Sequence, residues 1–214
     1  MNSSSSTEVH IPIRDFSLPG TLTIGERCKG IVVFAHGSGS SRLSTRNVAV
    51  AESLVDQGCG TLLFDLLTDD EAGSRANVFD IDLLGARVVG ATHWLMQQDV
   101  AHGLPIGYFG ASTGAAAALV AAAELRDTVA VVVSRGGRPD LAGEALASVT
   151  APTLLIVGSL DQTVLDLNRS AQEKLSCENK LVIVDGATHL FEEPGSLSYV
   201  AQQAGSWCIE KFPD

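Results

Sequence analysis

Short runs of consecutive apolar residues recur along this chain, and longer segments with apolar residues at helical spacing separate them. Such short runs are typical of strands that are buried on both faces of a sheet. The pattern predicts strands over residues 31–35, 61–65, 105–109, 129–133, 153–157 and 181–184. It predicts helices over residues 45–57, 80–98, 115–125, 141–147, 164–175 and 197–211, and a polar loop over residues 69–77. This alternation indicates an α/β fold, a mostly parallel sheet with helices on both faces.

The N-terminal part follows a different pattern. Two short strands are predicted over residues 9–13 and 21–24, with a turn between them at Pro19–Gly20. They bring the predicted sheet to eight strands. The polar, serine-rich residues 1–7 are expected to form a disordered tail. Residues 8–214 are expected to form a single domain, because a chain of this length buries about 70% of its unfolded surface in one core.

The charge balance narrows the range of partners. The formal net charge is −11 at pH 7 and the isoelectric point is about 4.8. Nucleic acid and anionic membranes would repel such a protein, so we expect neither as a partner. The chain starts without a basic and apolar leader, and its longest apolar runs are too short to span a membrane. We therefore expect a soluble, cytoplasmic protein, and its oligomeric state stays open.

The cysteines show no spacing that indicates a metal site or a disulfide framework. They occur singly, without a Cys-x-x-Cys pair, as Cys28, Cys59, Cys177 and Cys208. Free thiols are the favoured interpretation. We expect neither a metal ion nor another cofactor.

The first indication of chemistry is the segment Gly110–Gly114, which has the sequence Gly-Ala-Ser-Thr-Gly. It lies between the predicted strand 105–109 and the alanine-rich helix 115–125. A Gly-x-Ser-x-Gly sequence in this position makes a sharp turn that exposes the serine hydroxyl at the end of a sheet. Ser112 is therefore the candidate nucleophile. Ordinary turns also contain this pattern, so the interpretation requires a base and an acid at the same edge.

His189 is the candidate base. It follows the predicted strand 181–184 through a short flexible run, at the edge where the carboxyl ends of parallel strands meet. A neutral imidazole is suited to removing the serine proton, and activity should fall below about pH 6 to 7 as the base becomes charged. His10 is expected in a strand, His93 within a helix and His102 in a loop at the opposite edge of the sheet. His36 is expected to shape the glycine-rich loop over residues 36–40.

Asp161 is the candidate acid that orients the imidazole. It follows the predicted strand 153–157 at the reactive edge. An alternative role is to cap the helix over residues 164–175, which aspartate does well. Asp166 is the second candidate, but it lies inside that helix and should point away. The order serine, acid, histidine along the chain is that of the α/β-hydrolases.

Two backbone N–H groups are candidates for an oxyanion hole. One belongs to Thr113, at the positive end of the alanine-rich helix. The other belongs to Ser38, in the loop over residues 36–40, whose small residues allow it to fold close to the serine. A phosphate-binding glycine loop is the alternative for this segment, but the spacing matches neither common nucleotide motif.

The segments that contain these residues resemble the dienelactone-hydrolase-like branch of the α/β-hydrolases. The resemblance extends from about residue 29 to residue 207, and four segments carry it, residues 34–39, 110–114, 157–161 and 186–191. It implies hydrolysis of ester-like bonds through an acyl-enzyme intermediate. The chain is most similar to small serine members of this branch, some of which are fused to a phosphoribosyltransferase domain. No such domain is expected here.

One residue departs from the family pattern. Dienelactone hydrolases themselves use a cysteine nucleophile, whereas this chain has Ser112. The dienelactone substrate is therefore not carried over, and a general carboxylesterase is the expectation that the resemblance supports.

Two arginines follow the predicted strand 129–133 at the reactive edge. Arg135 and Arg138 are candidates to bind an anionic group of the substrate. The alternative is that they pair with nearby acids, for which the sequence offers Asp140, Glu192 and Glu193.

These observations predict a serine hydrolase that acts on small or short-chain carboxylic esters. The connection between the predicted strands 129–133 and 153–157 is too short for a large lid domain. Two alternatives stay open: a catalytically silent scaffold that binds a small molecule or a partner protein, and a thioesterase or acyltransferase that uses the same triad.

Overall fold

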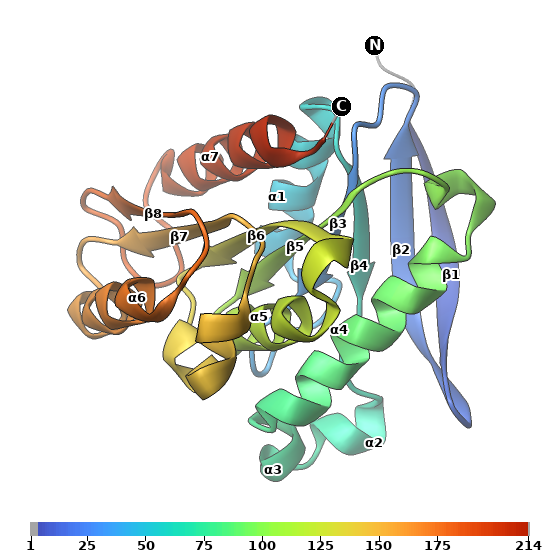
Figure 1. The fold of residues 1–214 in the computed structure, drawn as a ribbon, viewed down its shortest axis with the longest axis horizontal. Coiled ribbons are helices and arrows are strands. Elements are labelled where there is room, and N and C mark those ends of the chain that lie inside the picture. Colours follow the sequence, from blue (N-terminus) through green and yellow to red (C-terminus); the bar gives the residue numbers. More distant parts are fainter. Residues whose placement is uncertain (1–3, 214) are drawn as a thin grey trace.

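Eight strands form one sheet in the order β1-β2-β4-β3-β5-β6-β7-β8, in a computed structural model that describes residues 4–213 (Figure 1). β2 runs antiparallel to both of its neighbours, and the strands from β4 to β8 are parallel to one another. The α/β fold with a mostly parallel, eight-stranded sheet is therefore confirmed. The strands are β1 Ser4–Ile13, β2 Phe16–Gly25, β3 Ile31–Ala35, β4 Gly60–Phe64, β5 Ile106–Ala111, β6 Val129–Arg135, β7 Thr153–Gly158 and β8 Asn179–Val184.

Helices cover both faces of this sheet, as predicted (Figure 1). α1 and α7 pack together on one face, and α4, α5 and α6 lie on the other. None of the helices within residues 4–213 is long and apolar enough to cross a membrane. The α-helices are α1 Thr45–Asp56, α2 Asp69–Ala72, α3 Arg75–Val78, α4 Ile81–Met96, α5 Thr113–Leu125, α6 Gln162–Lys174 and α7 Ser196–Lys211. The 3₁₀ helices are η1 Asp99–Ala101, η2 Arg126–Thr128 and η3 Pro139–Ser148.

The central strands supply two cores, one on each face. In β3, Ile31, Val33 and Ala35 join the core beneath α4 and α5, whereas Val32 and Phe34 join the core beneath α1 and α7. Successive side chains of a strand point to opposite faces, so a strand between two cores needs an uninterrupted apolar sequence. That requirement explains why the apolar runs predicted the central strands.

The N-terminal hairpin turns at a different place than predicted. Pro19 and Gly20 lie inside β2, so the predicted turn is wrong, and the chain reverses at Arg14 and Asp15. Pro19 is tolerated in the strand because it lies beyond the ladder with β4, which ends at the pair Gly20 and Phe64. The ladder with β4 therefore does not need the backbone N–H that proline lacks.

The tail predicted over residues 1–7 is wrong for residues 4–7. These residues form the start of β1 and pair with β2, from Ser4 opposite Gly25 to Thr7 opposite Leu22. Their side chains are exposed, so the alternation of apolar and polar residues that marks a half-buried strand is absent. The backbone ladder holds this segment in place. Residues 1–3 lie outside the described residues.

Two connections also differ from the prediction. The expected polar loop over residues 69–77 contains α2 and α3, and a reciprocal capping box between Thr68 and Glu71 starts α2. The helix predicted over residues 141–147 is the 3₁₀ segment η3, which is kinked at Gly143. Within the described residues, this short connection between β6 and β7 holds no lid domain.

Candidate active site

Ser112 lies in a strained turn directly after β5. Its backbone angles are φ 51° and ψ −122°, and a non-glycine residue keeps such a conformation only when the surrounding structure imposes it. The N–H of Ser112 donates to the carbonyl of Arg135 at 3.3 Å, and the N–H of Arg138 donates to the carbonyl of Ser112 at 3.0 Å. The turn leaves the serine partly exposed at the carboxyl edge of the sheet.

Close packing requires the glycines on either side of Ser112. A Cβ atom at Gly110 would lie 2.4 Å from the Cα atom of Ala115 in α5. A Cβ atom at Gly114 would lie 2.1 Å from the carbonyl oxygen of Ala35 at the end of β3. Both distances are far below any van der Waals contact, so only glycine fits at either position.

His189 and Asp161 form a hydrogen-bonded pair at the same edge. The distance between His189 Nδ1 and Asp161 Oδ2 is 2.6 Å, and the side chains are 39% and 15% exposed. An ionised carboxylate only accepts hydrogen bonds, so Nδ1 carries the proton and Nε2 is left as the basic nitrogen. Asp161 precedes α6 but makes no capping bond with its side chain. Asp166, the second candidate, pairs with Arg169 on the exposed side of α6.

The serine and the histidine reach this edge from different strands. Gly136, directly after β6, lies beside His189, because a Cβ atom at Gly136 would be 3.6 Å from His189 Cε1. The residue before it, Arg135, accepts the N–H of Ser112. Among the described residues, no hydrogen bond joins the hydroxyl of Ser112 to His189. Such catalytic bonds are often long and tighten when substrate binds.

His36 lies in the glycine-rich loop with both ring nitrogens occupied. Its Nε2 accepts the N–H of Leu66 at 3.0 Å, and Nδ1 lies 3.1 Å from the carbonyl of Gly37. Nδ1 therefore donates and the ring is neutral, in line with burial, which lowers the pKa of His36. This histidine shapes the loop and is not free to transfer a proton. The other histidines have exposed side chains: His10 lies in β1, His93 lies in α4 and His102 follows η1.

The two predicted oxyanion donors lie next to each other. The N–H of Ser38 donates to the side-chain oxygen of Thr113 at 2.9 Å. Gly37 brings this loop against the nucleophile, since a Cβ atom there would lie 3.0 Å from the Cβ atom of Ser112. The Thr113 hydroxyl, whose role the sequence analysis did not foresee, thus connects the loop to the start of α5.

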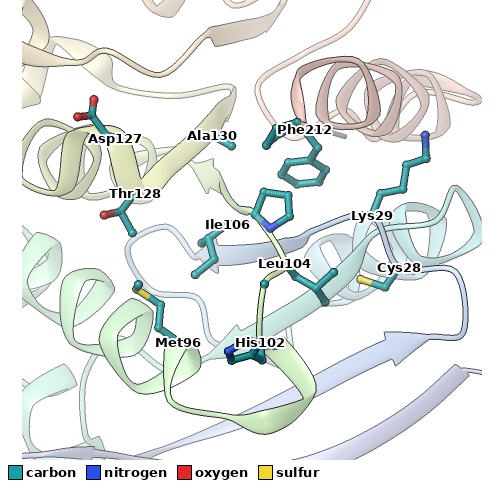
Figure 2. Close-up of a pocket in the computed structure, with 14 residues that line it drawn as sticks. Cys28, Lys29, Met96, His102, Leu104, Ile106, Asp127, Thr128, Ala130 and Phe212 are labelled. Carbon is teal, nitrogen blue, oxygen red and sulfur yellow. The ribbon is translucent and has the colours of Figure 1, made fainter.

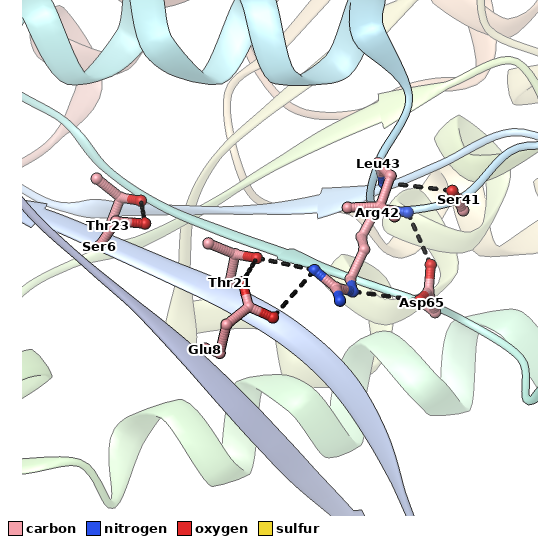
Figure 3. Close-up of polar contacts among 8 residues, drawn as sticks. All are labelled: Ser6, Glu8, Thr21, Thr23, Ser41, Arg42, Leu43 and Asp65. Atoms are coloured by element: carbon pink, nitrogen blue, oxygen red, sulfur yellow. Dashed lines mark hydrogen bonds and ion pairs between the residues drawn. The ribbon is translucent and has the colours of Figure 1, made fainter.

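Arg42 anchors the far end of this loop to the N-terminal hairpin (Figure 3). Its backbone N–H donates to Asp65 Oδ1 at 2.7 Å, and its Nε lies 3.4 Å from Asp65 Oδ2. Its Nη1 lies 3.2 Å from Glu8 Oε2 and donates to Thr21 Oγ1 at 3.0 Å. The loop that carries Ser38 is therefore held at both ends.

The two candidate arginines, Arg135 at the end of β6 and Arg138 in the loop after it, differ in their partners. Arg138 forms a bidentate pair with Asp140, with distances of 2.8 Å and 2.7 Å, and this pairing raises the pKa of Arg138. Arg135 is only 7% exposed, and its Nε and Nη1 have no partner within residues 4–213. Burial, together with the charge of Arg46, lowers the pKa of Arg135 to about 10.

The sequence analysis missed Arg46, which lies in the first turn of α1. Its Nη1 is 3.5 Å from Glu192 Oε1, in the loop that follows His189. A basic residue at the start of a helix opposes the helix dipole. That unfavourable position is the signal in the sequence that could have pointed to Arg46.

Two cavities lie at opposite edges of the sheet. One of about 280 Å³ borders the glycine-rich loop and includes His36, Ser38 and Leu66 in its lining. Another of about 810 Å³ lies at the amino ends of the strands, with His102 and Phe212 among its lining residues (Figure 2). The larger cavity is remote from Ser112 and from the histidine–aspartate pair.

Comparison with known proteins places this geometry in a family. The chain matches none of the family profiles against which it was compared. Dienelactone hydrolase from Anabaena variabilis is 51% identical, with a TM-score of 0.96 over 98% of this chain and 99% of that chain. This chain belongs to the dienelactone hydrolase family. Est1E from Butyrivibrio proteoclasticus shares the α/β-hydrolase fold at 17% identity, with a TM-score of 0.81 over 95% of this chain and 98% of that one.

The name of another relative of this chain refers to a different activity. A protein from Mycobacterium tuberculosis, which its name provisionally calls a phosphoribosyl transferase, is 59% identical over 203 residues. The match covers 95% of this chain and 46% of that protein. The chain thus spans about half the length of this curated relative.

Proposed function

We propose that this chain is a serine hydrolase that cleaves small carboxylic esters, with Ser112, His189 and Asp161 as its catalytic triad. The observation that carries the proposal is the 2.6 Å bond between His189 Nδ1 and Asp161 Oδ2, at the sheet edge where Ser112 is held in a strained, partly exposed turn. A hydrogen-bonded base beside an exposed hydroxyl is the arrangement that nucleophilic catalysis needs.

In the first half of the reaction, Ser112 Oγ attacks the ester carbonyl carbon while His189 Nε2 takes the serine proton. Asp161 holds the imidazole in the required tautomer and stabilises its positive charge. The backbone N–H groups of Thr113 and Ser38 stabilise the negative charge on the carbonyl oxygen. The tetrahedral intermediate then collapses, and the alcohol leaves with the proton that His189 returns to it.

In the second half, a water molecule attacks the acyl-enzyme. His189 takes a proton from the water, and the tetrahedral intermediate uses the same two N–H groups. Collapse of the intermediate releases the carboxylic acid, and the proton passes from His189 back to the oxygen of Ser112. The cycle consumes one ester and one water and needs no metal or organic cofactor.

The Thr113 hydroxyl adds a condition to this mechanism. It accepts the N–H of Ser38 at 2.9 Å, so a substrate oxygen must share or replace this acceptor. We propose that the Thr113 side chain rotates about its Cα–Cβ bond to free the donor. Because the loop of Ser38 is held by Arg42 and His36, the N–H keeps its direction when the acceptor changes.

The surroundings of the site favour small substrates. The connection between β6 and β7 holds no lid domain within the described residues, and the cavity beside the glycine-rich loop has a volume of about 280 Å³. A cavity of this size accommodates a short acyl or alcohol group, whereas long lipid chains need a larger enclosed surface.

A fluorophosphonate probe tests the proposal directly. We expect covalent labelling of the wild-type protein at Ser112 and none in Ser112→Ala, with hydrolysis of 4-nitrophenyl butyrate by the wild type alone. Thioester and alcohol-acceptor assays on the same proteins separate ester hydrolysis from thioester cleavage and acyl transfer. A folded wild type that neither reacts with the probe nor cleaves any ester would instead be a binding scaffold.

Phosphoribosyl transfer is the second candidate function, and the name of the Mycobacterium tuberculosis relative favours it. The match covers 46% of that protein, so the name can refer to the part of it that lies outside the match. Release of pyrophosphate from phosphoribosyl pyrophosphate by the purified chain would support this candidate. We expect no release, because the site contains a serine, a histidine and an aspartate arranged for acyl transfer.

A further inference from the structure

The side chain of Arg135, whose backbone carbonyl accepts the N–H of Ser112, is buried, and among the described residues it has no counter-ion. The residue is 7% exposed, and its Nε and Nη1 have no hydrogen-bond partner within residues 4–213. An unpaired buried cation is costly, because it loses its hydration and gains no acceptor in return. Native proteins keep such groups mainly where a ligand supplies the missing acceptors.

The sequence of β6 determines the side of the sheet on which this guanidinium lies. Val131 and Val133 pack in the core beneath α1 and α7, and Arg135 follows at the same spacing of two residues. Its side chain therefore leaves the strand on the face of α1 and α7. Its carbonyl accepts the N–H of Ser112, so this side chain leaves the backbone next to the candidate nucleophile.

The start of α1 adds a second cation to this place. Arg46 is close enough for its charge to lower the pKa of Arg135, and Arg46 Nε is also buried without a partner. Its contact with Glu192 is 3.5 Å long, and that carboxylate is 64% exposed, so the pair is weak. The first turn of α1 contains no acidic residue, and the side chain of Ser44 makes no capping bond. Arg46 thus lies at the positive end of α1, and its charge is close to that of Arg135.

We propose that Arg135, Arg46 and the N-terminus of α1 bind a phosphate group that the ester substrate carries. The phosphate is held on the α1 side of the site while Ser112 attacks the ester carbonyl. This inference rests on the proposed hydrolase function and names its substrate class.

The number of charges and acceptors favours phosphate over carboxylate. A phosphate dianion neutralises both guanidinium groups, and its three outer oxygens match several N–H donors at once. Helix N-termini are common phosphate sites for the same reason. A carboxylate has a single charge and two acceptor atoms, so it compensates only one of the two guanidinium groups.

Three esters with the same leaving group test the proposal. The 4-nitrophenyl esters of butyrate, succinate and 3-phosphonopropionate differ chiefly in their terminal methyl, carboxylate or phosphonate group. We expect kcat/KM for the phosphonate ester to exceed that for the butyrate ester by about tenfold or more, the effect of charge-assisted hydrogen bonds.

Variants connect this preference to the two arginines. In Arg135→Gln and in Arg46→Gln, the preference for the phosphonate ester should fall about tenfold, while kcat/KM for the butyrate ester changes by less than about threefold. Arg169→Gln removes an exposed arginine of α6 that pairs with Asp166, and it should keep the full preference. If Arg135→Gln does not fold, Arg135→Lys and Arg46→Gln provide the same comparison.

Three outcomes would overturn the proposal. They are equal rates with the phosphonate and butyrate esters, a preference for the succinate ester over the phosphonate ester, and an equal loss on all three esters in Arg135→Gln. The last outcome would assign Arg135 a structural role.

Calorimetric titration of Ser112→Ala with inorganic phosphate at low ionic strength separates the anion site from the hydrolase function. If phosphate binds and the additional change Arg135→Gln abolishes that binding, the anion site is supported. This holds even if the wild type cleaves none of the esters, a result that would overturn the hydrolase function alone. Hydrolysis of the butyrate ester without any phosphate binding would overturn the site alone.

Discussion

The two edges of the central sheet differ in what they expose. At the carboxyl edge, Ser112 lies in a strained turn, His189 and Asp161 form a hydrogen-bonded pair, and a cavity of about 280 Å³ borders the glycine-rich loop. At the amino edge, a cavity of about 810 Å³ has a mostly apolar lining that includes Met96 and Phe212 (Figure 2). The strained backbone of Ser112 and the hydrogen-bonded imidazole of His189 lie at the edge with the smaller of these two cavities.

This difference shows that the volume of a cavity is a poor guide to the position of chemistry in this protein. The carboxyl ends of parallel strands direct several loops toward one point, and a strained residue persists there because many contacts hold it. At the amino edge, the lining side chains have no comparable network. Mutations that act on one edge and spare the other test the comparison.

The largest effect is expected from the triad. Ser112→Ala and His189→Ala should each lower kcat for 4-nitrophenyl butyrate by about a million-fold, and Asp161→Asn by about ten-thousand-fold, because the three groups act as a unit. His102→Ala, an exposed histidine of the larger cavity, should retain activity within about twofold. Circular dichroism checks that each variant is folded. Comparable losses at both edges would remove the distinction between them.

A second comparison concerns glycines at the two edges. Gly114→Ala places a methyl group 2.1 Å from the carbonyl oxygen of Ala35, whereas Gly25, at the end of β2, has nothing within 4 Å of its Cβ position. We expect Gly114→Ala to lower the free energy of unfolding by about 2–4 kcal/mol. Gly25→Ala should change it by less than about 0.5 kcal/mol. Urea denaturation measures both, and equal midpoints would show that the carboxyl edge is not tightly packed.

A smaller effect is expected from the buried histidine of the glycine-rich loop. Burial lowers the pKa of His36 below its ordinary value of 6.5. As the pH falls, the unfolded chain therefore binds a proton at this residue before the native protein does. The stability contributed by the neutral ring is present above about pH 6.5 and is lost as the pH falls from there toward the lower native pKa.

Unfolding measurements between pH 7 and pH 5 test this sign. The wild type should lose more free energy of unfolding over this range than His36→Asn. His10→Asn changes an exposed histidine of β1, and it should show the wild-type dependence. A steeper loss in His36→Asn than in the wild type would contradict the neutral, hydrogen-bonded ring.

Much of the fold could be predicted from the sequence, because a strand between two cores must be apolar throughout. This holds for β3, whose bounds match the prediction. It fails for the first residues of β1, because an edge strand with exposed side chains leaves no hydrophobic pattern. It also fails at Pro19 and Gly20, which usually mark turns but here lie in β2. Their place depends on the ladder between strands, which local sequence does not encode.

For the candidate site, the sequence indicated the loops but not the contacts between them. Ser112, Asp161 and His189 each follow a predicted strand, which places them at one edge, but the 2.6 Å bond depends on the conformation of two separate loops. The sequence offered Asp140 as a partner for either Arg135 or Arg138, but it could not show that only Arg138 pairs with this acid.

The backbone of the nucleophile has a consequence for the protein as a whole. Ser112 holds φ at 51°, which costs a residue with a side chain about 1–3 kcal/mol and costs glycine far less. The variant Ser112→Gly, which lacks the proposed nucleophile, should therefore melt at a higher temperature than the wild type. Such a gain would show that the fold keeps a costly conformation at this one position, as expected where natural selection has favoured turnover over endurance.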